Sequence, residues 1–381
     1  MKEYKLSQLL EIKNGKDHKE LPNGDYPVFG SGGVMRYVNE YLYDKASILL
    51  PRKGSLNNIQ YCDVPFWTVD TLYYTEVNEK IACPYYLYNY LCLLDLSGLD
   101  TGTGVPSMTF DSYYNIKVLL PEIEEQKRVA SVLQNLDHKI ALNRQINDNL
   151  EAMAKQLYDY WFVQFDFPNE EGKPYKSSGG AMVWNEKLKR EIPQEWSDCK
   201  LKDFINLFDS KRVPLSSKDR GERQGVYPYY GATGIMDYVN DYIFDGDYIL
   251  LAEDGSTSDA KGFPIVQYIW GKNWVNNHAH IILPKNERYT MFTYQMLRSI
   301  PAKQIETGSI QKKISQENLC GYKMVLPNSD LLEKYENVVS PLWEKRKRCI
   351  EEINTLTKQR DELLPLLMNG QATVNYHLSA Y

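Results

Sequence analysis

Two stretches of this chain decide its organisation: residues 26–55 read YPVFGSGGVMRYVNEYLYDKASILLPRKGS, and residues 227–256 read YPYYGATGIMDYVNDYIFDGDYILLAEDGS. At a constant offset of 201 positions, without a gap, 15 of these 30 positions are identical. Identity this dense over a strand-and-turn pattern indicates an internal duplication. A duplicated chain can carry two similar surfaces on one pseudo-symmetric body, so a two-part ligand is its natural target.

The duplication continues on both sides of those stretches. The segment 67–73 aligns with 274–280, and KVLLP at 117–121 aligns with KMVLP at 323–327. The starts of the two halves also match, as YKL at 4–6 against CKL at 199–201. Each half is therefore long enough for one globular unit and an appended element.

The composition bounds the class of protein. The chain has 381 residues, 43% of them hydrophobic, which suffices for two cores. It has no apolar run of 18 residues and no signal-peptide core, so we expect no membrane segment and a cytoplasmic location. The six cysteines form no CxxC pair, which is typical of reduced thiols. A net charge of −6 argues mildly against a free-standing nucleic-acid binder, although cations cluster within residues 211–223.

The chain alternates between two kinds of composition. Residues 1–121 and 197–327 are rich in Gly, Tyr and short apolar alternations, which predict two globular parts of mixed strand and helix. Residues 122–165 and 328–371 instead show apolar side chains at helical spacing. The segment 166–196 is polar and rich in Gly, and we interpret it as a linker; 372–381 remain as a tail.

The apolar spacing of the two helical segments is heptad-like. A helix of about 40 residues would be about 60 Å long, too long to pack along one small domain. Polar residues such as Asn143, Lys139, Arg346 and Arg360 interrupt the seam, as register-setting residues do in coiled coils. We expect an antiparallel coiled coil between the two helices; the alternative is that each helix folds back on its own domain. The expected seam residues are Val129, Val132, Leu136, Ile146, Leu150, Met153, Leu157, Val339, Leu342, Cys349, Ile353, Leu356, Leu363 and Leu367.

Signatures of catalysis are absent from the sequence. There is no GxxxxGK[ST] loop, no NPP[YF] tetrapeptide, no GxSxG elbow and no HExxH helix. The glycine turn at 30–33 is followed by a Tyr-rich strand, not by a helix, so we interpret it as a turn and not a cofactor loop. His278 and His280 lack nearby further ligands and have Thr71 and Tyr73 as repeat partners, so we predict no metal site.

Several motifs, in this order, resemble the specificity subunit of type I restriction–modification systems. They are LPEIEEQ at 120–126, NLEAMA at 149–154, WFVQFD at 161–166, IPQEW at 192–196, NNHAH at 276–280 and ELLPLLMNG at 362–370. The resemblance covers essentially the whole chain. It implies an α+β fold with two similar α/β target-recognition domains, 1–121 and 197–327, separated by two long helices that pair as an antiparallel coiled coil.

The resemblance also implies a function. Each recognition domain would read one half of a bipartite site in double-stranded DNA, and the helical spacers would fix the gap. Two methyltransferase subunits would dock on the spacers, and restriction subunits would join the full complex. The chain itself would be non-catalytic and would hold no cofactor, because S-adenosylmethionine and ATP with Mg²⁺ would bind the partner subunits.

Base reading requires polar side chains that differ between the two halves: Arg or Lys for guanine, Asn or Gln for adenine. Some of these residues would contact phosphates and only position the domain. Arg52-Lys53 is informative, because its repeat partner is Glu253-Asp254, which indicates two different half-sites. The expected DNA-contacting residues are Lys16, His18, Arg36, Arg52, Lys53, Asn57, Asn58, Lys211, Arg212, Lys218, Arg220, Arg223, Lys272, Asn273, Gln311, Lys312 and Lys313.

Two alternatives stay open at the level of sequence. A compact nuclease or methyltransferase with an unrecognised motif would turn over substrate alone, but it leaves the full-length duplication unexplained. A coiled-coil scaffold or carbohydrate-binding protein would use the 30 tyrosines as contact surface and would show no sequence-selective DNA binding.

Overall fold

The computed structural model describes residues 1–99, 106–308 and 312–374. It divides into two compact units, Met1–Arg144 with Ile350–Tyr381, and Gln145–Cys349. We call them unit 1 and unit 2 and describe each by itself. Each of the two long helices contributes one end to unit 1 and the other end to unit 2.

Unit 1 is built on two small sheets. Its larger sheet has four antiparallel strands in the order β2 (Leu10–Lys13), β8 (Leu72–Val77), β5 (Ser47–Pro51) and β6 (Gln60–Cys62). The second sheet has the order β4 (Gly33–Val38), β3 (Tyr26–Gly30) and β7 (Trp67–Thr68), with β3 and β7 parallel. The strands β1 (Lys2–Lys5) and β9 (Lys117–Leu120) pair with each other, and the short helices are α1 (Pro84–Cys92) and α2 (Phe110–Tyr114).

The central strand of unit 1, β5, is buried along its whole length. All five residues of β5 are buried, because both faces of the strand are covered: Ile48 and Leu50 pack into one core cluster and Leu49 into another. Its one polar side chain, Ser47, donates a hydrogen bond to the carbonyl of Thr75 at 2.7 Å, so burial leaves it satisfied. Helix α1 begins at Pro84, a residue suited to the first turn because it lacks an N–H.

Unit 2 repeats the order of these strands and adds a fourth strand to the second sheet. Its larger sheet has the order β13 (Ile205–Leu207), β20 (Ala279–Pro284), β17 (Tyr248–Ala252) and β18 (Val266–Ile269). The second sheet has the order β15 (Ile235–Val239), β14 (Gln224–Tyr230), β19 (Lys272–Val275) and β16 (Phe244–Asp245), and β14 is again parallel to β19. The strands β12 (Ser197–Lys200) and β23 (Lys323–Leu326) pair as β1 and β9 do. The predicted duplication is confirmed.

Unit 2 also has short helices and hairpins. Three helices correspond in order to elements of unit 1: α4 (Leu201–Phe204), α6 (Thr290–Ser299) and α7 (Gln316–Gly321). Helix α5 (Ser217–Glu222) precedes β14, and β21 (Glu306–Thr307) pairs with β22 (Lys313–Ile314). The helix α5 begins with a capping box, in which Ser216 and Asp219 satisfy each other's backbone N–H groups.

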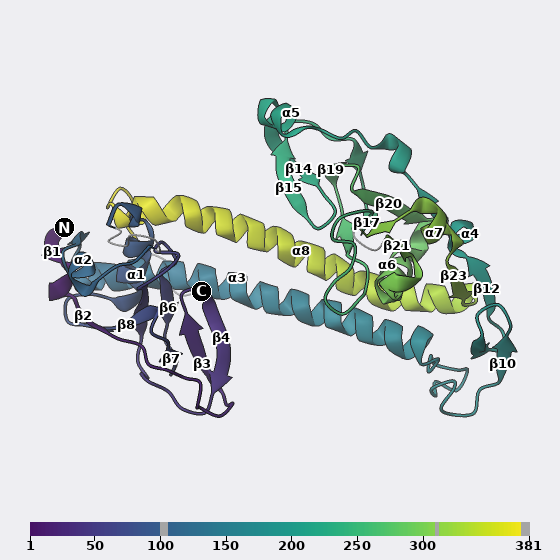
Figure 1. The fold of residues 1–381 in the computed structure, drawn as a ribbon, viewed down its shortest axis with the longest axis horizontal. Coiled ribbons are helices and arrows are strands. Elements are labelled where there is room, and N and C mark those ends of the chain that lie inside the picture. The colour runs from purple at the N-terminus through teal and green to yellow at the C-terminus, as the bar shows by residue number, and fades with distance from the viewer. Residues whose placement is uncertain (100–105, 309–311, 375–381) are drawn as a thin grey trace. The chain divides into compact units, whose positions relative to one another are not determined.

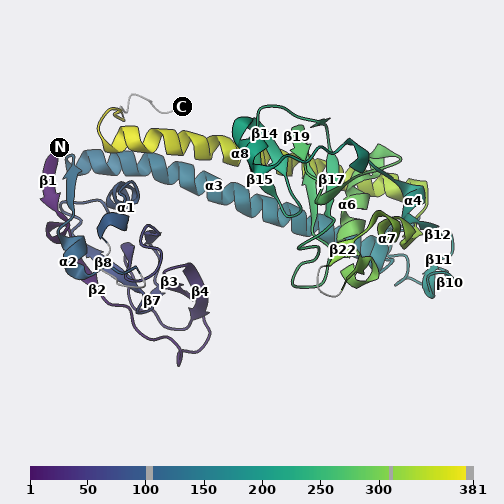
Figure 2. The ribbon, with the colours of Figure 1, turned by 45° about the horizontal axis from the view of Figure 1, so that its top comes forward.

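The two long helices are α3 (Ile123–Tyr158), which continues as a π-helical turn over Asp159–Val163, and α8 (Ser329–Met368). They lie side by side in both ribbon views (Figures 1 and 2). In unit 1, Arg360 bonds Asp137 at 2.8 Å and Asn143 bonds Glu352 at 2.9 Å. In unit 2, Arg346 bonds Glu151 at 2.8 Å. Because residue numbers rise along α3 as they fall along α8, the helices are antiparallel, as predicted.

The buried side of α3 follows alternating steps of three and four residues, the period of a coiled coil. Its positions are Gln126, Val129, Leu133, Leu136, Ile140, Asn143, Asn147, Leu150, Ala154, Leu157 and Trp161, all buried or half-buried. On α8, the expected positions Val339, Cys349, Leu356 and Leu367 are buried, and Leu342 and Ile353 are half-buried.

Two expected seam residues lie outside the seam, and this corrects the prediction. Met153 is 53% exposed, because the step from Leu150 is four residues and the fully buried Ala154 takes the position. Leu363 is 37% exposed, and Leu364 is half-buried in its place. Val132 and Ile146 are half-buried beside the seam. At both of these helical turns the adjacent residue is also apolar, so hydrophobicity alone does not identify which of the two lies in the seam.

The segment 166–196 is more structured than a linker. It contains the antiparallel hairpin of β10 (Met182–Asn185) and β11 (Arg190–Pro193). Phe167 stacks on Trp196 with 5.2 Å between ring centroids, and both are buried in the core of unit 2. The polar composition of the segment predicts a linker, but these aromatic residues fix the segment to unit 2.

Within the described residues, no helix combines the length and the apolar content needed to cross a bilayer. All six cysteines carry free thiols, and Cys62 and Cys349 are buried.

Candidate nucleic-acid interface

One backbone arrangement occurs in both units, where the loop after the central strand meets two other segments. In unit 1, the N–H of Arg52 donates to the carbonyl of Thr71 at 2.9 Å, and its carbonyl accepts from the N–H of Met108 at 3.0 Å. In unit 2, the N–H of Glu253 donates to the carbonyl of His278 at 2.9 Å, and its carbonyl accepts from the N–H of Ile314 at 2.8 Å. We call this arrangement the frame.

The frame ends at the same kind of turn in both units. Gly54 and Gly255, at equivalent repeat positions, have φ values of +90° and +75°. A side chain at this φ is strained, so glycine keeps the loop in one conformation. Bridges join Lys53 to Ser107 and Asp254 to Lys313, again at equivalent positions. The backbone of the frame is therefore the same although its side chains differ.

In each unit, the side chain of a buried ring residue forms a hydrogen bond with a backbone carbonyl next to the frame. The hydroxyl of Tyr73 donates to the carbonyl of Met108 at 3.3 Å, and Nε2 of His280 lies 2.8 Å from the carbonyl of Ile314. Arg52 lies over the Tyr73 ring, 5.9 Å from its centroid. A hydroxyl group in unit 1 and an imidazole nitrogen in unit 2 thus bond to carbonyls at equivalent backbone positions.

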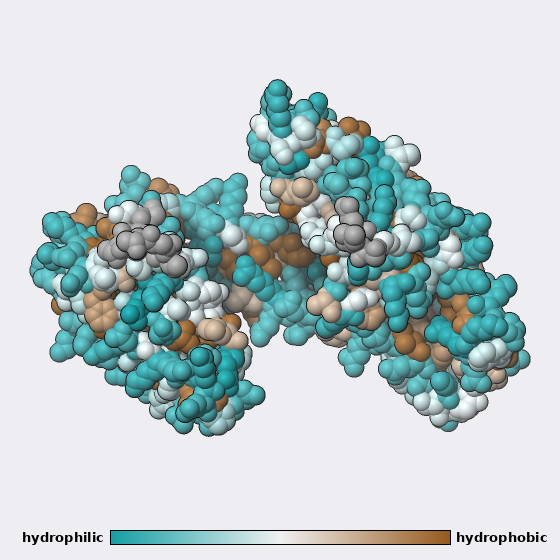
Figure 3. Space-filling model, viewed as in Figure 1, coloured by the Kyte–Doolittle hydropathy of each residue, from teal (hydrophilic) through white to brown (hydrophobic). Residues whose placement is uncertain are grey.

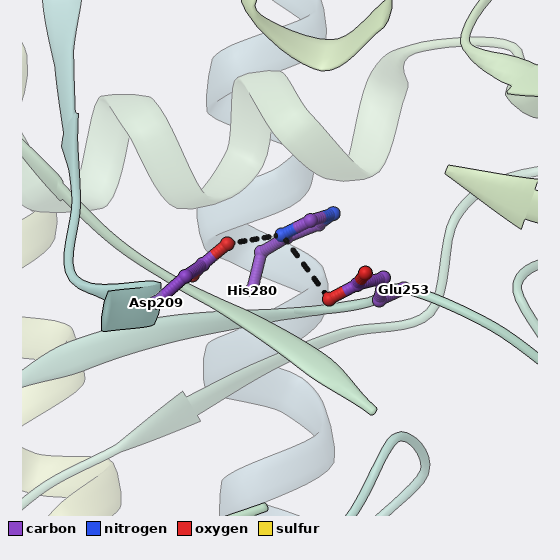
Figure 4. A group of neighbouring side chains, drawn as sticks. All are labelled: Asp209, Glu253 and His280. Carbon is purple, nitrogen blue, oxygen red and sulfur yellow. Dashed lines mark hydrogen bonds and ion pairs between the residues drawn. The ribbon is translucent and has the colours of Figure 1, made fainter. Parts of the chain in front are cut away.

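In unit 2, the ring belongs to a buried charged cluster (Figure 4). Nδ1 of His280 lies 2.6 Å from Asp209 and 3.7 Å from Glu253. Arg212 donates to Glu253 at 2.8 Å and to the carbonyl of Ala279 at 2.8 Å, and Lys313 lies 3.2 Å from Glu253. Each of the two carboxylates is therefore paired with more than one basic side chain.

The cluster changes the acidity of its two carboxyl groups. Burial alone would raise the pKa of Asp209, but hydrogen bonds from His280 and from the N–H of Ile281 hold that pKa below its usual range. Burial acts on Glu253 in the same direction, and the bond from Arg212 and the charge of His280 outweigh it, so the pKa of Glu253 is also lowered. Both groups are stabilised as carboxylates.

Asp209, Glu253 and His280 place ligand atoms within 4.8 Å of one another, which is close enough to surround a metal ion. Both ring nitrogens of His280 face acceptors, which leaves no lone pair for an ion. Asp209 also accepts from Ile281 and Gln316, and Glu253 accepts from Arg212. These bonds fit an internal ion-pair network, and they do not fit a cation site.

Several predicted DNA-contacting residues are engaged inside the fold. Arg36 donates to the carbonyl of Leu21 at 2.8 Å, and Arg220 pairs with Asp237 at 3.1 Å while lying over the Tyr229 ring. Arg212 belongs to the buried cluster. These three arginines therefore already have partners within their own units, and their contact with DNA stays a prediction.

Asn273 also differs from the prediction. It is fully buried in β19, and its amide donates to the carbonyl of Gly271 at 2.8 Å, so it does not reach a base. Three successive residues of β19, from Asn273 to Val275, are buried, so both faces of the strand are covered there. Gln311 lies outside the described residues.

The remaining predicted residues lie at the surface, and some have partners there. Asn57 accepts from the N–H of Leu96, and Asn58 donates to the carbonyl of Ser31. Lys312 pairs with Glu306 at 3.1 Å, and Lys218 lies 4.0 Å from Glu222. Lys211 and Lys272 lie over the rings of Phe208 and Tyr242. Lys16, Lys53 and Arg223 are exposed, and His18 is half-buried with Nδ1 unpaired among the described residues.

Two residues of the frame, His278 and Asp254, are not among the DNA-contacting residues predicted from the sequence. Nδ1 of His278 lies 2.7 Å from Oδ1 of Asp254, and the His278 side chain is 48% exposed. His278 therefore lies at the surface while His280 is buried, so the two imidazoles do not form a metal pair. The signal that could have found them is their repeat relation to Thr71 and Lys53.

The paired helices of unit 2 carry an exposed apolar groove. It is lined by Met153 and Gln156 of α3, by Tyr160 of the π-helical turn that follows, and by Val338 and Leu342 of α8. Figure 3 shows hydrophobic surface on the long helices within an otherwise largely hydrophilic face. Apolar side chains exposed together on a helix pair are typical of a protein interface.

Comparison with known proteins gives consistent matches. The family described as "Type I restriction modification DNA specificity domain" matches residues 1–152 and 193–336. The MjaIX specificity subunit of Methanocaldococcus jannaschii is 23% identical over 389 residues, covering 93% of this chain and 86% of the relative. A putative specificity subunit of Haemophilus influenzae, S.HindORF215P, is 33% identical over 142 residues, covering 37% of this chain and 35% of that protein.

A solved structure has the same fold. The S subunit of a type I restriction–modification system from M. genitalium superposes with a TM-score of 0.65 at 18% identity. The match covers 96% of this chain and 95% of that one.

Proposed function

Because the chain belongs to the type I restriction–modification DNA specificity family, we propose that it directs a methyltransferase complex to a bipartite DNA site. The chain is a recognition subunit and not a catalyst. One recognition domain, residues 1–121, reads one half-site, and the other, residues 197–327, reads the second. The helical spacers, 122–165 and 328–371, set the gap between them.

The observation that carries this proposal is the repeated frame. Two copies of one backbone arrangement bear different exposed side chains, as two readers of different sequences require. Both copies belong to a chain whose two long helices each contribute to both units. The spacing of half-sites on DNA is a geometric consequence of the spacing between reading domains.

The exposed cations have a separate role in this proposal. Lys16, Lys211, Lys218, Arg223 and Lys272 contact phosphates and position each domain without reading sequence. This set of cations is small and the net charge of the chain is −6. Partner subunits therefore contribute further positive surface. His18, Asn57 and Asn58 remain candidates for contacts to DNA from unit 1, as Lys312 and Lys313 do from unit 2.

We propose that the partners are two methyltransferase subunits, which dock on the paired helices, and restriction subunits in a larger complex. The apolar groove of unit 2 supports such docking. S-adenosylmethionine binds the methyltransferase subunits, and ATP with Mg²⁺ binds the restriction subunits. The complex acts on cellular DNA in the cytoplasm.

Methylome sequencing tests the central part of this proposal. A host that expresses the chain with its cognate methyltransferase should show one split methylated motif, and deletion of the chain should remove that motif. Replacing residues 1–121 with the corresponding domain of a relative should alter one half of the motif only. Methylation that persists after the deletion would contradict the specificity role.

Docking on the helices has its own test. The double variant Met153→Glu, Val338→Glu should reduce copurification of the methyltransferase, because charge enters the apolar groove. Lys345→Glu is the matched control, since it is exposed on α8 outside the groove. Equal copurification of both variants with the wild type would place the docking surface elsewhere.

A further inference from the structure

The frame presents different chemistry at equivalent surface positions of the two units. Lys53 in unit 1 corresponds to Asp254 in unit 2, and Thr71 corresponds to His278. The backbone bonds that hold these positions are the same to within 0.2 Å in length: 2.9 and 2.9 Å for one bond, 3.0 and 2.8 Å for the other. Side-chain differences on one fixed backbone are what distinguishes two readers with a common fold.

In unit 1 the frame presents an available cation. Lys53 is exposed, and among the described residues its ammonium has no hydrogen-bond or ion-pair partner. Its neighbour Arg52 is held over Tyr73 and donates to the carbonyl of Asp70 at 3.3 Å, so the loop is fixed while Lys53 stays free. An ammonium in the major groove matches the O6 and N7 acceptors of guanine.

In unit 2 the frame presents an oriented acceptor. The carboxylate of Asp254 lies 2.7 Å from Nδ1 of His278, so that nitrogen carries the proton and donates to it. When the ring is neutral, its lone pair therefore lies on Nε2, which then accepts a hydrogen bond. An acceptor of this kind matches the exocyclic amino group of adenine or cytosine, and it does not match guanine O6 or N7.

Phosphate contact does not explain these positions equally well. A surface that binds phosphate in both units would carry a cation at both copies of the position. Unit 2 instead carries Asp254 where unit 1 carries Lys53, and the neighbouring Lys313 is paired with Glu253 at 3.2 Å. The difference therefore favours base reading at this position of the frame.

We propose that Lys53 and His278 are specificity-determining residues, and this rests on the proposed function. Lys53 selects guanine at one position of the half-site read by unit 1. His278, positioned by Asp254, selects a base with an exocyclic amino group in the half-site read by unit 2.

The test uses the full complex with its methyltransferase, in methylome sequencing and in competition binding with oligonucleotides that vary one base at a time. Lys53→Ala should relax one base position in one half-site, and His278→Ala one position in the other. Each should lower discrimination at that position by about 5- to 150-fold. Lys53→Gln should shift the preference from guanine to adenine, a gain that misfolding does not produce.

Controls separate the possible failures. Arg223→Ala, an exposed cation outside the frame, should weaken binding to all sequences alike and leave the motif unchanged. If Lys53→Ala and His278→Ala also leave every base preference unchanged, the frame does not read bases and the inference is wrong. That result is distinct from failure of the proposed function, in which deletion of the whole chain leaves the methylated motif in place.

Discussion

Beneath the frame, units 1 and 2 solve the same structural problem in different ways. Unit 1 supports its loop with the neutral hydroxyl of Tyr73, while unit 2 uses His280 within a buried cluster of Asp209, Glu253 and Arg212. The backbone above is unchanged. This fold therefore tolerates exchange of buried polar groups as long as one donor reaches the same carbonyl.

The largest expected difference between the units follows from breaking that support. Asp209→Ala leaves His280 without its closest acceptor inside unit 2, and we expect a loss of about 3–5 kcal/mol in the free energy of unfolding. Tyr73→Phe removes one long neutral hydrogen bond from unit 1, and the expected loss is about 1 kcal/mol. Denaturant unfolding of the two full-length variants measures both values, and equal losses would contradict the comparison.

A second difference concerns pH. Burial raises the pKa of Glu336 in α8 to about 7, above its ordinary value of 4.5, while its repeat position in α3 is Ala130. Between these pH values the native state binds more protons than the unfolded state, so unit 2 loses stability as pH rises from 4.5 through 7. The loss should approach about 3 kcal/mol.

The variant Glu336→Gln should remove most of this pH dependence, because the amide keeps an acceptor for the N–H of Phe292 and carries no charge. Glu333→Gln, at an exposed position one turn earlier, is the matched control. Thermal unfolding at pH 5 and pH 8 gives the result. An unchanged decline in Glu336→Gln would show that other groups cause it.

The two units share one close backbone contact at a glycine. A Cβ at Gly24 would lie 2.4 Å from Cα of Asn39, and at the repeat position Gly225 it would lie 2.3 Å from Cα of Asn240. Gly24→Ala and Gly225→Ala should therefore destabilise by similar amounts, about 1–3 kcal/mol each. Gly32→Ala is the control, since no atom beyond the two adjacent residues lies within 4 Å of its Cβ position. A loss in only one unit would mean that the packing of these strands is not duplicated.

The sequence predicted most of the fold, because periodicity and repetition are local properties of the chain. The duplication, the two long helices and their antiparallel pairing are all present. The errors have physical causes: Met153 lies one residue from the seam, and the aromatic anchors Phe167 and Trp196 were masked by polar neighbours.

The candidate site was less predictable. Charge and residue type nominated Arg36, Arg212 and Arg220, but their partners Leu21, Glu253 and Asp237 come from other parts of the chain. Only the folded structure shows which cations are already paired. The sequence alone also does not show that His278 pairs with Asp254, because the two residues are 24 positions apart.

The most direct test of the central claim is a chain in which a second copy of residues 197–327 replaces residues 1–121. Expressed with the methyltransferase, it carries two identical recognition domains related by the pseudo-twofold repeat. Methylome sequencing should then show a split, symmetric motif, in which the half-site of unit 2 occurs twice in inverted orientation. A motif that stays asymmetric, with the original half-site of unit 1 still present, would contradict the claim that each unit reads its own half.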